Sequence, residues 1–307
     1  MHIPGCSNGA AIIVMGLSLV HPSAATAADP PIEVNPNRPT FATPAQTTQI
    51  GVAELELGIQ HSDFRDQSGL FWSPYLLKMG LLSNVEIRVG GTGVLHQAEA
   101  TSPAVTGFGD LTVGAQWRYL RQGPLGFDDA VQVTLKIPTA SATKGLGSGE
   151  SDETLMLLFS RDLGAFHSDL NLLETWLGRP QASHARQPAA TLSVSRTMSG
   201  QWSLTGEVYY VGATADTPRI VSNLWAIAFK VSPRLVVDGG ADIGLSHGAQ
   251  KISLFAGLTV GLSRFHHPVN ASGSLDRHQA TMTPAGSCAI TSAGQAAMML
   301  RMDEEPR

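Results

Sequence analysis

Apolar and polar side chains alternate along most of the chain between Thr47 and Phe265. In the stretch GFGDLTVGAQWRYL, polar or small residues from Asp110 onward alternate with Leu111, Val113, Ala115, Trp117 and Tyr119. Successive side chains of a β-strand point to opposite faces, so this pattern predicts strands with one polar and one apolar face. Twelve such segments follow one another, at roughly 47–60, 69–78, 85–96, 108–120, 129–138, 153–162, 166–177, 189–197, 201–212, 219–231, 234–245 and 251–265.

The connections between these segments alternate in length. Longer ones, such as PTASATKGLGSGES, are followed by short ones, such as LGA, MSG and SP, with RQGPLGFD as a moderate exception. An antiparallel up-and-down barrel with long loops on one rim and tight turns on the other produces this alternation. An even number of strands puts both ends of the barrel on the short-turn side, which faces the periplasm in bacterial barrels. The predicted fold class is therefore all-β, a transmembrane barrel of about twelve strands.

The polar faces carry charged residues that lipid would reject. An Arg or Lys at mid-depth on the lipid side costs about 2–4 kcal/mol, so we expect the apolar faces to meet lipid and the polar faces to line the lumen. Opposite charges there would set selectivity or simply neutralise one another. The candidate lumen-lining residues are Glu54, Glu56, Glu86, Arg88, Asp110, Gln116, Arg118, Lys136, Asp169, Glu207, Asp238 and Asp242.

Strand geometry bounds the bore. Twelve strands about 4.7 Å apart and tilted by about 40° give a backbone diameter of roughly 24 Å. Side chains on both walls would leave a bore of at most about 10 Å, which admits a small molecule and excludes a folded protein.

Both ends of the chain differ from the barrel region. Residues 1–27 read as a signal peptide, with the apolar run AAIIVMGLSLV and the small-x-small pattern Ala25-Thr26-Ala27, although no Lys or Arg precedes the run. Residues 28–46 form a Pro-rich periplasmic lead-in that could tuck into the barrel mouth, since proline cannot pair in a central strand. Residues 266–307 lack alternation and are expected to be a disordered tail. Cleavage would remove Cys6 and leave Cys288 alone, so no disulfide framework is expected.

Six stretches, in order, carry a family resemblance: NPNRPTFATPAQ, ELELG, LLKMGLLSNVEIRVG, GFGDLTVGAQWRYL, VTLKIPTA and SDETLMLLFSRDLG. Together they resemble the outer-membrane family named for the MetA, or meta-cleavage, pathway of phenol degradation, over about residues 35–265. The resemblance implies a β-barrel in the bacterial outer membrane that takes up small molecules, aromatic compounds among them. Members of such barrels usually end on an aromatic residue that the barrel-assembly machinery recognises; Phe265 lies at that position, but a tail follows it.

Catalytic and metal-binding readings are weak. His61-Ser62 and Ser246-His247 are adjacent pairs, and neighbours on a strand face opposite ways, so neither suits a nucleophile and its base. The histidines His184, His266 and His267 lack the Cys or carboxylate spacing of a metal site. The run GLGSGES lacks the Lys and hydroxyl ending of a phosphate loop. We expect no enzyme activity, metal or cofactor, and with a net charge of -5 and no basic tract we expect no nucleic-acid partner.

The expected function is passive transport of small molecules across the outer membrane, with the lipid bilayer and the solutes as partners. Two alternatives stay open. The lumen could be plugged, giving a surface receptor or a structural envelope protein. A secreted soluble β-sandwich is a further reading, favoured slightly by the low aromatic content of 6%.

Overall fold

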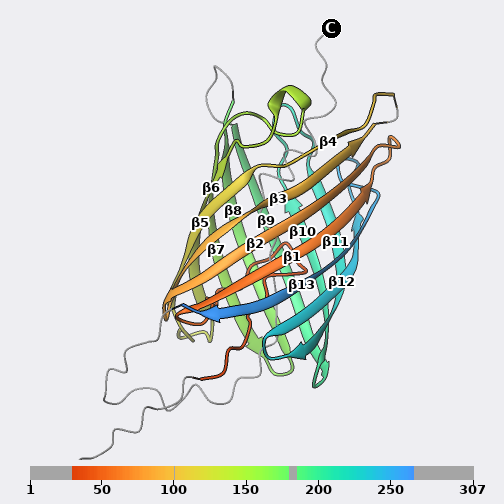
Figure 1. Cartoon of the computed structure of the whole chain (residues 1–307). Helices are drawn as coiled ribbons and strands as arrows, with labels where there is room; N and C mark the ends of the chain where they lie inside the picture. Colours follow the sequence, from red (N-terminus) through yellow and green to blue (C-terminus); the bar gives the residue numbers. More distant parts are fainter. Residues whose placement is uncertain (1–29, 100, 180–184, 266–307) are drawn as a thin grey trace, which may run out of the picture. The chain divides into compact units, whose positions relative to one another are not determined.

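The computed structural model describes residues 30–99, 101–179 and 185–265. The expected signal peptide, both cysteines, His184 and the expected tail lie outside these ranges. Thirteen strands make one sheet (Figure 1): β1 Val52–Asp63, β2 Gly69–Leu82, β3 Val85–Ala98, β4 Val105–Gly107, β5 Leu111–Leu120, β6 Asp128–Ile137, β7 Asp152–Leu163, β8 Phe166–Leu177, β9 Ala185–Ser199, β10 Trp202–Val211, β11 Ile220–Ser232, β12 Leu235–Gly244 and β13 Ile252–Arg264.

The sheet closes on itself as an up-and-down barrel. Strands adjacent in the chain pair antiparallel, except β4 and β5, and β1 pairs with β13 from Val52↔Arg264 to Asp63↔Ile252. Strands β4 and β5 both pair with β3, so they share one place in the wall and the barrel has twelve places in all. Pairing of β1 with β13 removes the two long edges that an open sheet would expose, as a membrane interior requires. The predicted all-β, twelve-stranded barrel is confirmed.

Two strand predictions need correction. The first strand was expected from Thr47 but begins at Val52, because Gly51 turns the chain with φ 72° and residues before it leave the wall. The fourth strand was expected from Phe108, but β5 begins at Leu111, and the short strand β4, in a stretch expected to be a loop, ends at Gly107. Between them the amide of Gly109 donates to the carbonyl of Thr92 at 3.0 Å. Elsewhere the predicted and observed strands agree to within a few residues.

Loop lengths alternate as expected. Strands β2 and β3, β7 and β8, and β11 and β12 are joined by two-residue turns at one rim. The opposite rim carries the longer connections, including residues 138–151, which contain the single described helical turn, η1 Ala142–Lys144. The barrel wall begins at Val52 and ends at Arg264, both on the short-turn rim (Figure 1).

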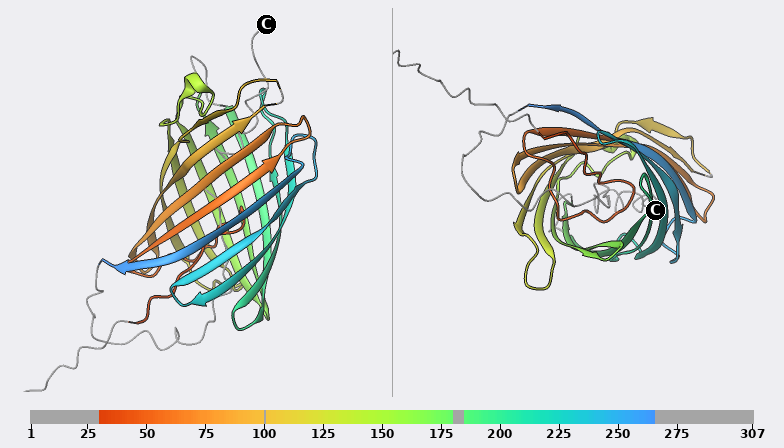
Figure 2. Two further views of the ribbon diagram at one scale, coloured as in Figure 1. Left: turned by 45° about the vertical axis from the view of Figure 1, so that its right-hand side comes forward. Right: turned by 90° about the horizontal axis from the view of Figure 1, so that it is seen from below.

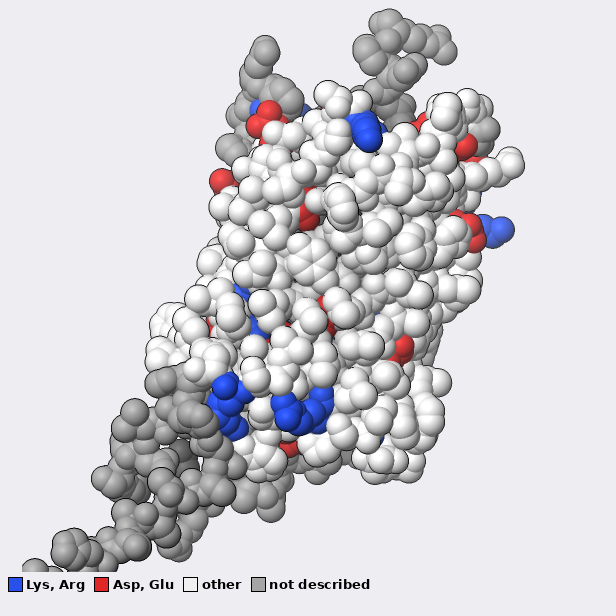
Figure 3. Space-filling model, viewed as in Figure 1, with Lys and Arg blue, Asp and Glu red and all other residues white. Residues whose placement is uncertain are grey.

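The outer face is apolar and the inner face mostly polar. Outward positions on the middle strands include exposed Val133, Leu157, Leu172, Val194 and Ile227, whereas their inward neighbours are buried. The face in Figure 3 shows few charged groups across its middle and more toward its two ends. Among the described residues, no helix has the length and apolar character needed to cross a membrane. The apolar side chains thus lie on the outside and the polar ones on the inside, the reverse of a water-soluble protein. An outer face of this kind is suited to contact with lipid.

A non-strand segment occupies the interior. Residues 34–50 enter at the short-turn rim, where the amide of Val34 donates to the carbonyl of Pro233 at 2.9 Å, and return to that rim to begin β1. Viewed along the barrel, this segment, called here the inner segment, forms a loop within the ring of strands (Figure 2). Most of its residues from Asn37 to Ala45 are buried.

A charge on the outer face tests the lipid assignment. Leu172 lies at the middle of β8 with 44% of its surface exposed, and Leu163 lies at the rim end of β7 with 52% exposed. We expect Leu172→Lys to lower the free energy of unfolding by about 2–4 kcal/mol and Leu163→Lys by about 1 kcal/mol or less, because the cost falls from the midplane to the interface. Urea titration of the protein folded into lipid vesicles measures both. Equal costs at the two depths would contradict a lipid-facing wall.

Candidate functional site

The structure turns all the sequence-predicted polar residues inward or toward the rim of the lumen. Arg118 is half-buried near the short-turn rim, and the other candidates are buried. The buried set is Glu54, Glu56, Glu86, Arg88, Asp110, Gln116, Lys136, Asp169, Glu207, Asp238 and Asp242. Most of them act on the inner segment, directly or through one further side chain.

Wall carboxylates accept hydrogen bonds from the backbone of the inner segment. Both oxygens of Glu207 are used, one by the amide of Phe41 and the other by that of Ala42, each at 2.7 Å. The amide of Thr48 donates to Glu86 at 2.6 Å. A buried N–H group needs a partner, and a charged acceptor makes the stronger hydrogen bond. The carboxylates therefore replace the strand or helix pairing that the segment lacks.

A buried lysine completes this arrangement beside β1. The amides of Asn35 and Asn37 donate to Glu54 and Glu56 at 3.2 and 2.5 Å. Lys78 of β2 lies 3.2 Å from Glu54 and 2.9 Å from Glu56, and its ammonium also donates to the side chain of Asn37 at 2.9 Å and to the carbonyl of Asn35. Two carboxylates thus share one cation. Removing one partner of such a buried group is strongly destabilising, by about 3–5 kcal/mol.

Arg38 holds the inner segment against β12, which lies across the β1–β13 seam from β1 and β2. Its guanidinium makes a bidentate ion pair with Asp238 of β12, with nitrogen–oxygen distances of 3.2 and 3.1 Å. A Cβ at Gly58 would lie 2.2 Å from Arg38 Nη1, and a Cβ at Gly257 would lie 2.2 Å from Arg38 Nε. The two glycines, on paired positions of β1 and β13, make room for the guanidinium.

Neutral side chains of the wall hold residues 43–46 of the inner segment. Asn171 of β8 accepts from the amide of Thr43 at 2.5 Å and donates to its carbonyl at 2.8 Å. Ser160 accepts from the amide of Ala45 at 2.7 Å and donates to Asp169 at 2.6 Å, so Asp169 acts on the segment through Ser160. Gln116 donates to the carbonyls of residues 44–46. The segment is therefore tethered to strands all around the wall, namely β1, β2, β3, β5, β6, β7, β8, β10 and β12.

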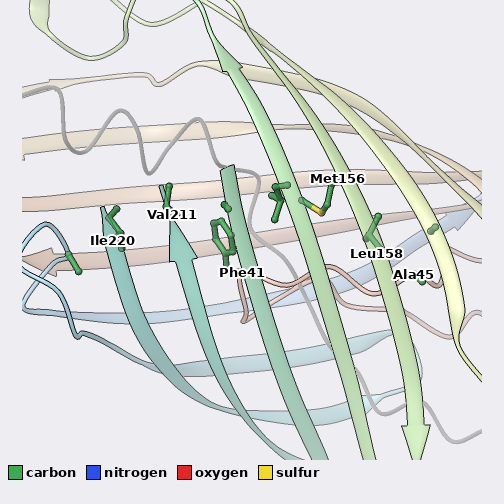
Figure 4. Packing of buried hydrophobic residues seen from close by; sticks show 10 residues of the cluster. Phe41, Ala45, Met156, Leu158, Val211 and Ile220 are labelled. Atoms are coloured by element: carbon green, nitrogen blue, oxygen red, sulfur yellow. The ribbon is translucent and has the colours of Figure 1, made fainter. Parts of the chain in front are cut away.

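An apolar patch lies on the inner wall beside the segment. The ring of Phe41 stacks on Tyr209 with centroids 4.9 Å apart, and Tyr209 donates to Asp242 at 2.6 Å. Phe41 and Ala45 belong to a cluster on β6–β11 and the β12–β13 loop (Figure 4), whose other members are Ala130, Met156, Leu158, Leu173, Ala189, Val211, Ile220 and Ala249. The apolar patch thus lies among polar inward side chains of the same strands, such as Asn171 of β8 and Glu207 of β10.

A second ionic group lies at the long-loop rim. Lys136 is 2.6 Å from Asp152 and 3.7 Å from Asp110, and its ammonium donates to Ser148 at 2.9 Å. Asp110 accepts from the amide of Ala140 at 2.9 Å. These contacts fasten the 138–151 loop over the mouth rather than holding the inner segment.

The remaining candidates support their neighbours. Arg88 lies 3.5 Å from Glu86 and donates to Gln116 at 2.8 Å and to Gln132. Arg118 pairs with Asp128 at 3.1 Å near the short-turn rim. Each luminal cation thus lies beside at least one carboxylate.

Alternation missed several residues that contact the segment. Lys78 lies on a strand whose two faces are both largely apolar, with Leu70, Trp72 and Leu76 inward, so its inward position gave no periodic signal. Met156 and Leu158 escaped for the same reason on β7. The Pro-rich stretch that contains Asn37, Arg38 and Phe41 has no periodicity. The positions of these side chains in the barrel are set by contacts with residues later in the chain.

The adjacent His and Ser residues face opposite ways. His61 is exposed and lies 3.1 Å from Asp63, while Ser62 is buried and lies 2.7 Å from Ser253. Across the residues that the structure describes, no group of three or more His, Cys, Asp or Glu side chains is arranged to hold a metal ion. The described lumen is lined largely by polar side chains and is occupied by the inner segment.

Solved structures with the same architecture include outer-membrane channels. The COG4313 outer membrane channel from Pseudomonas putida F1 is 15% identical, with a TM-score of 0.56 over 71% of this chain and 98% of that one. The NanC porin is 8% identical, with a TM-score of 0.50 over 68% of this chain and 100% of that one. The comparison with curated protein sequences found no match. Residues 36–262 match the family described as "Putative MetA-pathway of phenol degradation", and the chain belongs to that family.

Proposed function

We propose that the protein is a passive conduit for small molecules across the bacterial outer membrane. The observation that carries the proposal is a closed barrel with an apolar exterior whose polar lumen holds a tethered coil instead of a packed domain. A coil held by individual hydrogen bonds narrows the bore while leaving the barrel wall independent of it. No energy source or cofactor is needed for transport down a gradient, and no catalytic step is proposed.

The two sides of the lumen suit amphipathic solutes. Ion pairs lie on β1, β2 and β3, and the apolar patch that includes Phe41, Met156 and Ile220 lies against β6–β11. Binding pockets for small molecules combine apolar walls with a few polar groups in this way. The family description refers to phenol degradation, and the COG4313 structure is of an outer membrane channel. Both support transport of small molecules, with aromatic compounds among the expected solutes.

A plugged barrel is the second candidate, and one observation favours it. The inner segment has tethers on nine strands, and its residues from Arg38 to Ala45 are buried. A segment that never moves would make the barrel a surface receptor or a structural protein. The two functions differ in a single measurable quantity, the solute flux through the intact protein.

Assembly would proceed through the barrel-assembly machinery. Phe265 follows the last residue of β13, its side chain is exposed, and its amide donates to the carbonyl of Gly51 at 2.8 Å. An exposed aromatic residue at the end of the closing strand is the feature proposed for recognition. The tail beyond it lies outside the described residues.

The flux of the unmodified protein tests the conduit directly. Protein refolded in detergent and inserted into a planar bilayer should give discrete ionic conductance, and liposomes that contain it should release small solutes. Heat-modifiable mobility on a gel shows that the barrel is folded. A folded barrel without conductance or release would sink the conduit and leave the plugged barrel.

Loosening the segment should widen the bore. Glu207→Ala removes the acceptor of two backbone amides, so we expect higher and noisier single-channel conductance than in the unmodified protein. Glu174→Ala is the matched control, because Glu174 pairs with exposed Arg186 on the outer side of β8 and β9. Equal conductance of both variants would mean that the segment does not limit flow.

Displacing Arg38 from Asp238 tests a second tether of the inner segment, by a substitution in the barrel wall. In Gly58→Ala the three atoms nearest to the new methyl group all belong to the Arg38 guanidinium, which must move away from Asp238. We expect faster cleavage of the inner segment by a protease added from the short-turn side, together with raised conductance. Gly69→Ala is the control, since the nearest atom to its new methyl would lie 3.7 Å away. Unchanged cleavage in Gly58→Ala would show that the ion pair does not hold the segment.

A further inference from the structure

Two hydrogen-bond donors at the long-loop mouth of the lumen have no partner within the part of the chain that the structure describes. The indole nitrogen Nε1 of Trp72 and the amide nitrogen Nε2 of Gln97 are both buried, and neither has an acceptor among the described residues. The two side chains are 3% and 5% exposed. Leaving a buried donor unpaired is costly, so native proteins rarely keep one without a reason.

The two donors belong to the same stretch of inner wall. Trp72 of β2 pairs with Leu95 of β3, and Gln97 pairs with Leu70, so the donors are diagonal neighbours across adjacent strands. Diagonal pairs on one face of a sheet lie within reach of long and aromatic side chains. One small group between them can therefore meet both.

The donors border an apolar cup. Leu70, Trp72 and Leu95 pack with Ala140 and Leu146 of the 138–151 loop, and Phe64 and Val105 extend the cluster at the same rim. A methyl group at Gly107 would lie 2.4 Å from Leu146 Cδ1, so the glycine lets the leucine reach inward. Leu146 itself is 1% exposed. The chain thus fills its own cup with one loop side chain that contributes no acceptor to the donors.

The cations near the cup already have partners. Asp110 accepts from the amide of Ala140, and it shares the ammonium of Lys136 with Asp152. Arg65, next to Phe64, donates to the backbone carbonyls of Gly244 and Ala249. A ligand that satisfies the two N–H donors here is better neutral than charged.

We propose that this cup, formed by Leu70, Trp72, Leu95, Gln97 and the displaceable Leu146, binds a small neutral molecule with an apolar body and one acceptor oxygen. The oxygen accepts from the Trp72 indole and the Gln97 amide, and the apolar body takes the place of Leu146. The inference deepens the proposed conduit, because it assumes that the solute enters from the long-loop mouth. It assigns the class of solute that is captured first.

Binding of acetophenone to the folded protein in detergent tests the proposal. Acetophenone has a carbonyl acceptor, isopropylbenzene has a similar shape without it, and benzoate has an anionic acceptor. We expect acetophenone to bind at least about tenfold more tightly than either comparator, the difference that one well-placed hydrogen bond supplies. Trp72 reports binding by fluorescence, because it is the one buried tryptophan of the five: Trp117, Trp202 and Trp225 are about half exposed, and Trp176 is half-buried on the outward face of β8. Equal affinity for acetophenone and isopropylbenzene in the unmodified protein would overturn the donor assignment.

Variants test the contribution of the two donors and that of the 138–151 loop separately. Gln97→Leu should weaken acetophenone binding about tenfold and leave isopropylbenzene unchanged, whereas Leu146→Ala should tighten both by about tenfold. Trp72→Phe, followed by equilibrium dialysis, should weaken acetophenone as Gln97→Leu does, and Trp117→Phe is its control. Unchanged acetophenone affinity in both Gln97→Leu and Trp72→Phe would overturn the site. Binding without flux in liposomes would refute the conduit and keep the site; flux without binding would do the reverse.

Discussion

The hydrogen bond from a backbone amide of the inner segment to a carboxylate of the wall is the interaction on which the interior depends. Apart from a single bridge between Ile50 and Gly80, residues 34–50 run through the barrel without strand or helix pairing, so their amides require other acceptors. Glu54, Glu56, Glu86 and Glu207 supply them from β1, β3 and β10. Neutral acceptors, Asn171 and Ser160, serve the amides of Thr43 and Ala45. The side-chain amides of Gln116 and Asn171 donate to carbonyls of the same part of the segment.

The cations of the lumen follow from those carboxylates. Buried acids need compensation, and Lys78, Arg88 and Arg38 each lie beside one or two of them. Because these pairs face inward, the outer face is left to apolar side chains that lipid tolerates. The same alternation that suits the bilayer therefore also builds the inner anchoring surface.

Much of this could be predicted from sequence. The strand positions, the loop pattern and the inward carboxylates follow from a period of two and from the cost of charge in lipid, both of which are local properties. The course of the inner segment could not be predicted, because it is set by pairs such as Phe41 with Glu207 and Arg38 with Asp238, which lie 166 and 200 residues apart. The apolar inner positions, including Trp72 and Met156, were missed because strands with two apolar faces have no alternation to read.

The sequence separation between Arg38 and Asp238 limits when this tether of the inner segment can form. Arg38 precedes the first strand, yet its partner Asp238 lies on β12, close to the end of the sheet. The tethers on β1 and β2 lie near the segment in the sequence, whereas the tether on β12 exists only once that strand has joined the sheet. The complete anchoring of the lumen therefore requires a nearly complete barrel.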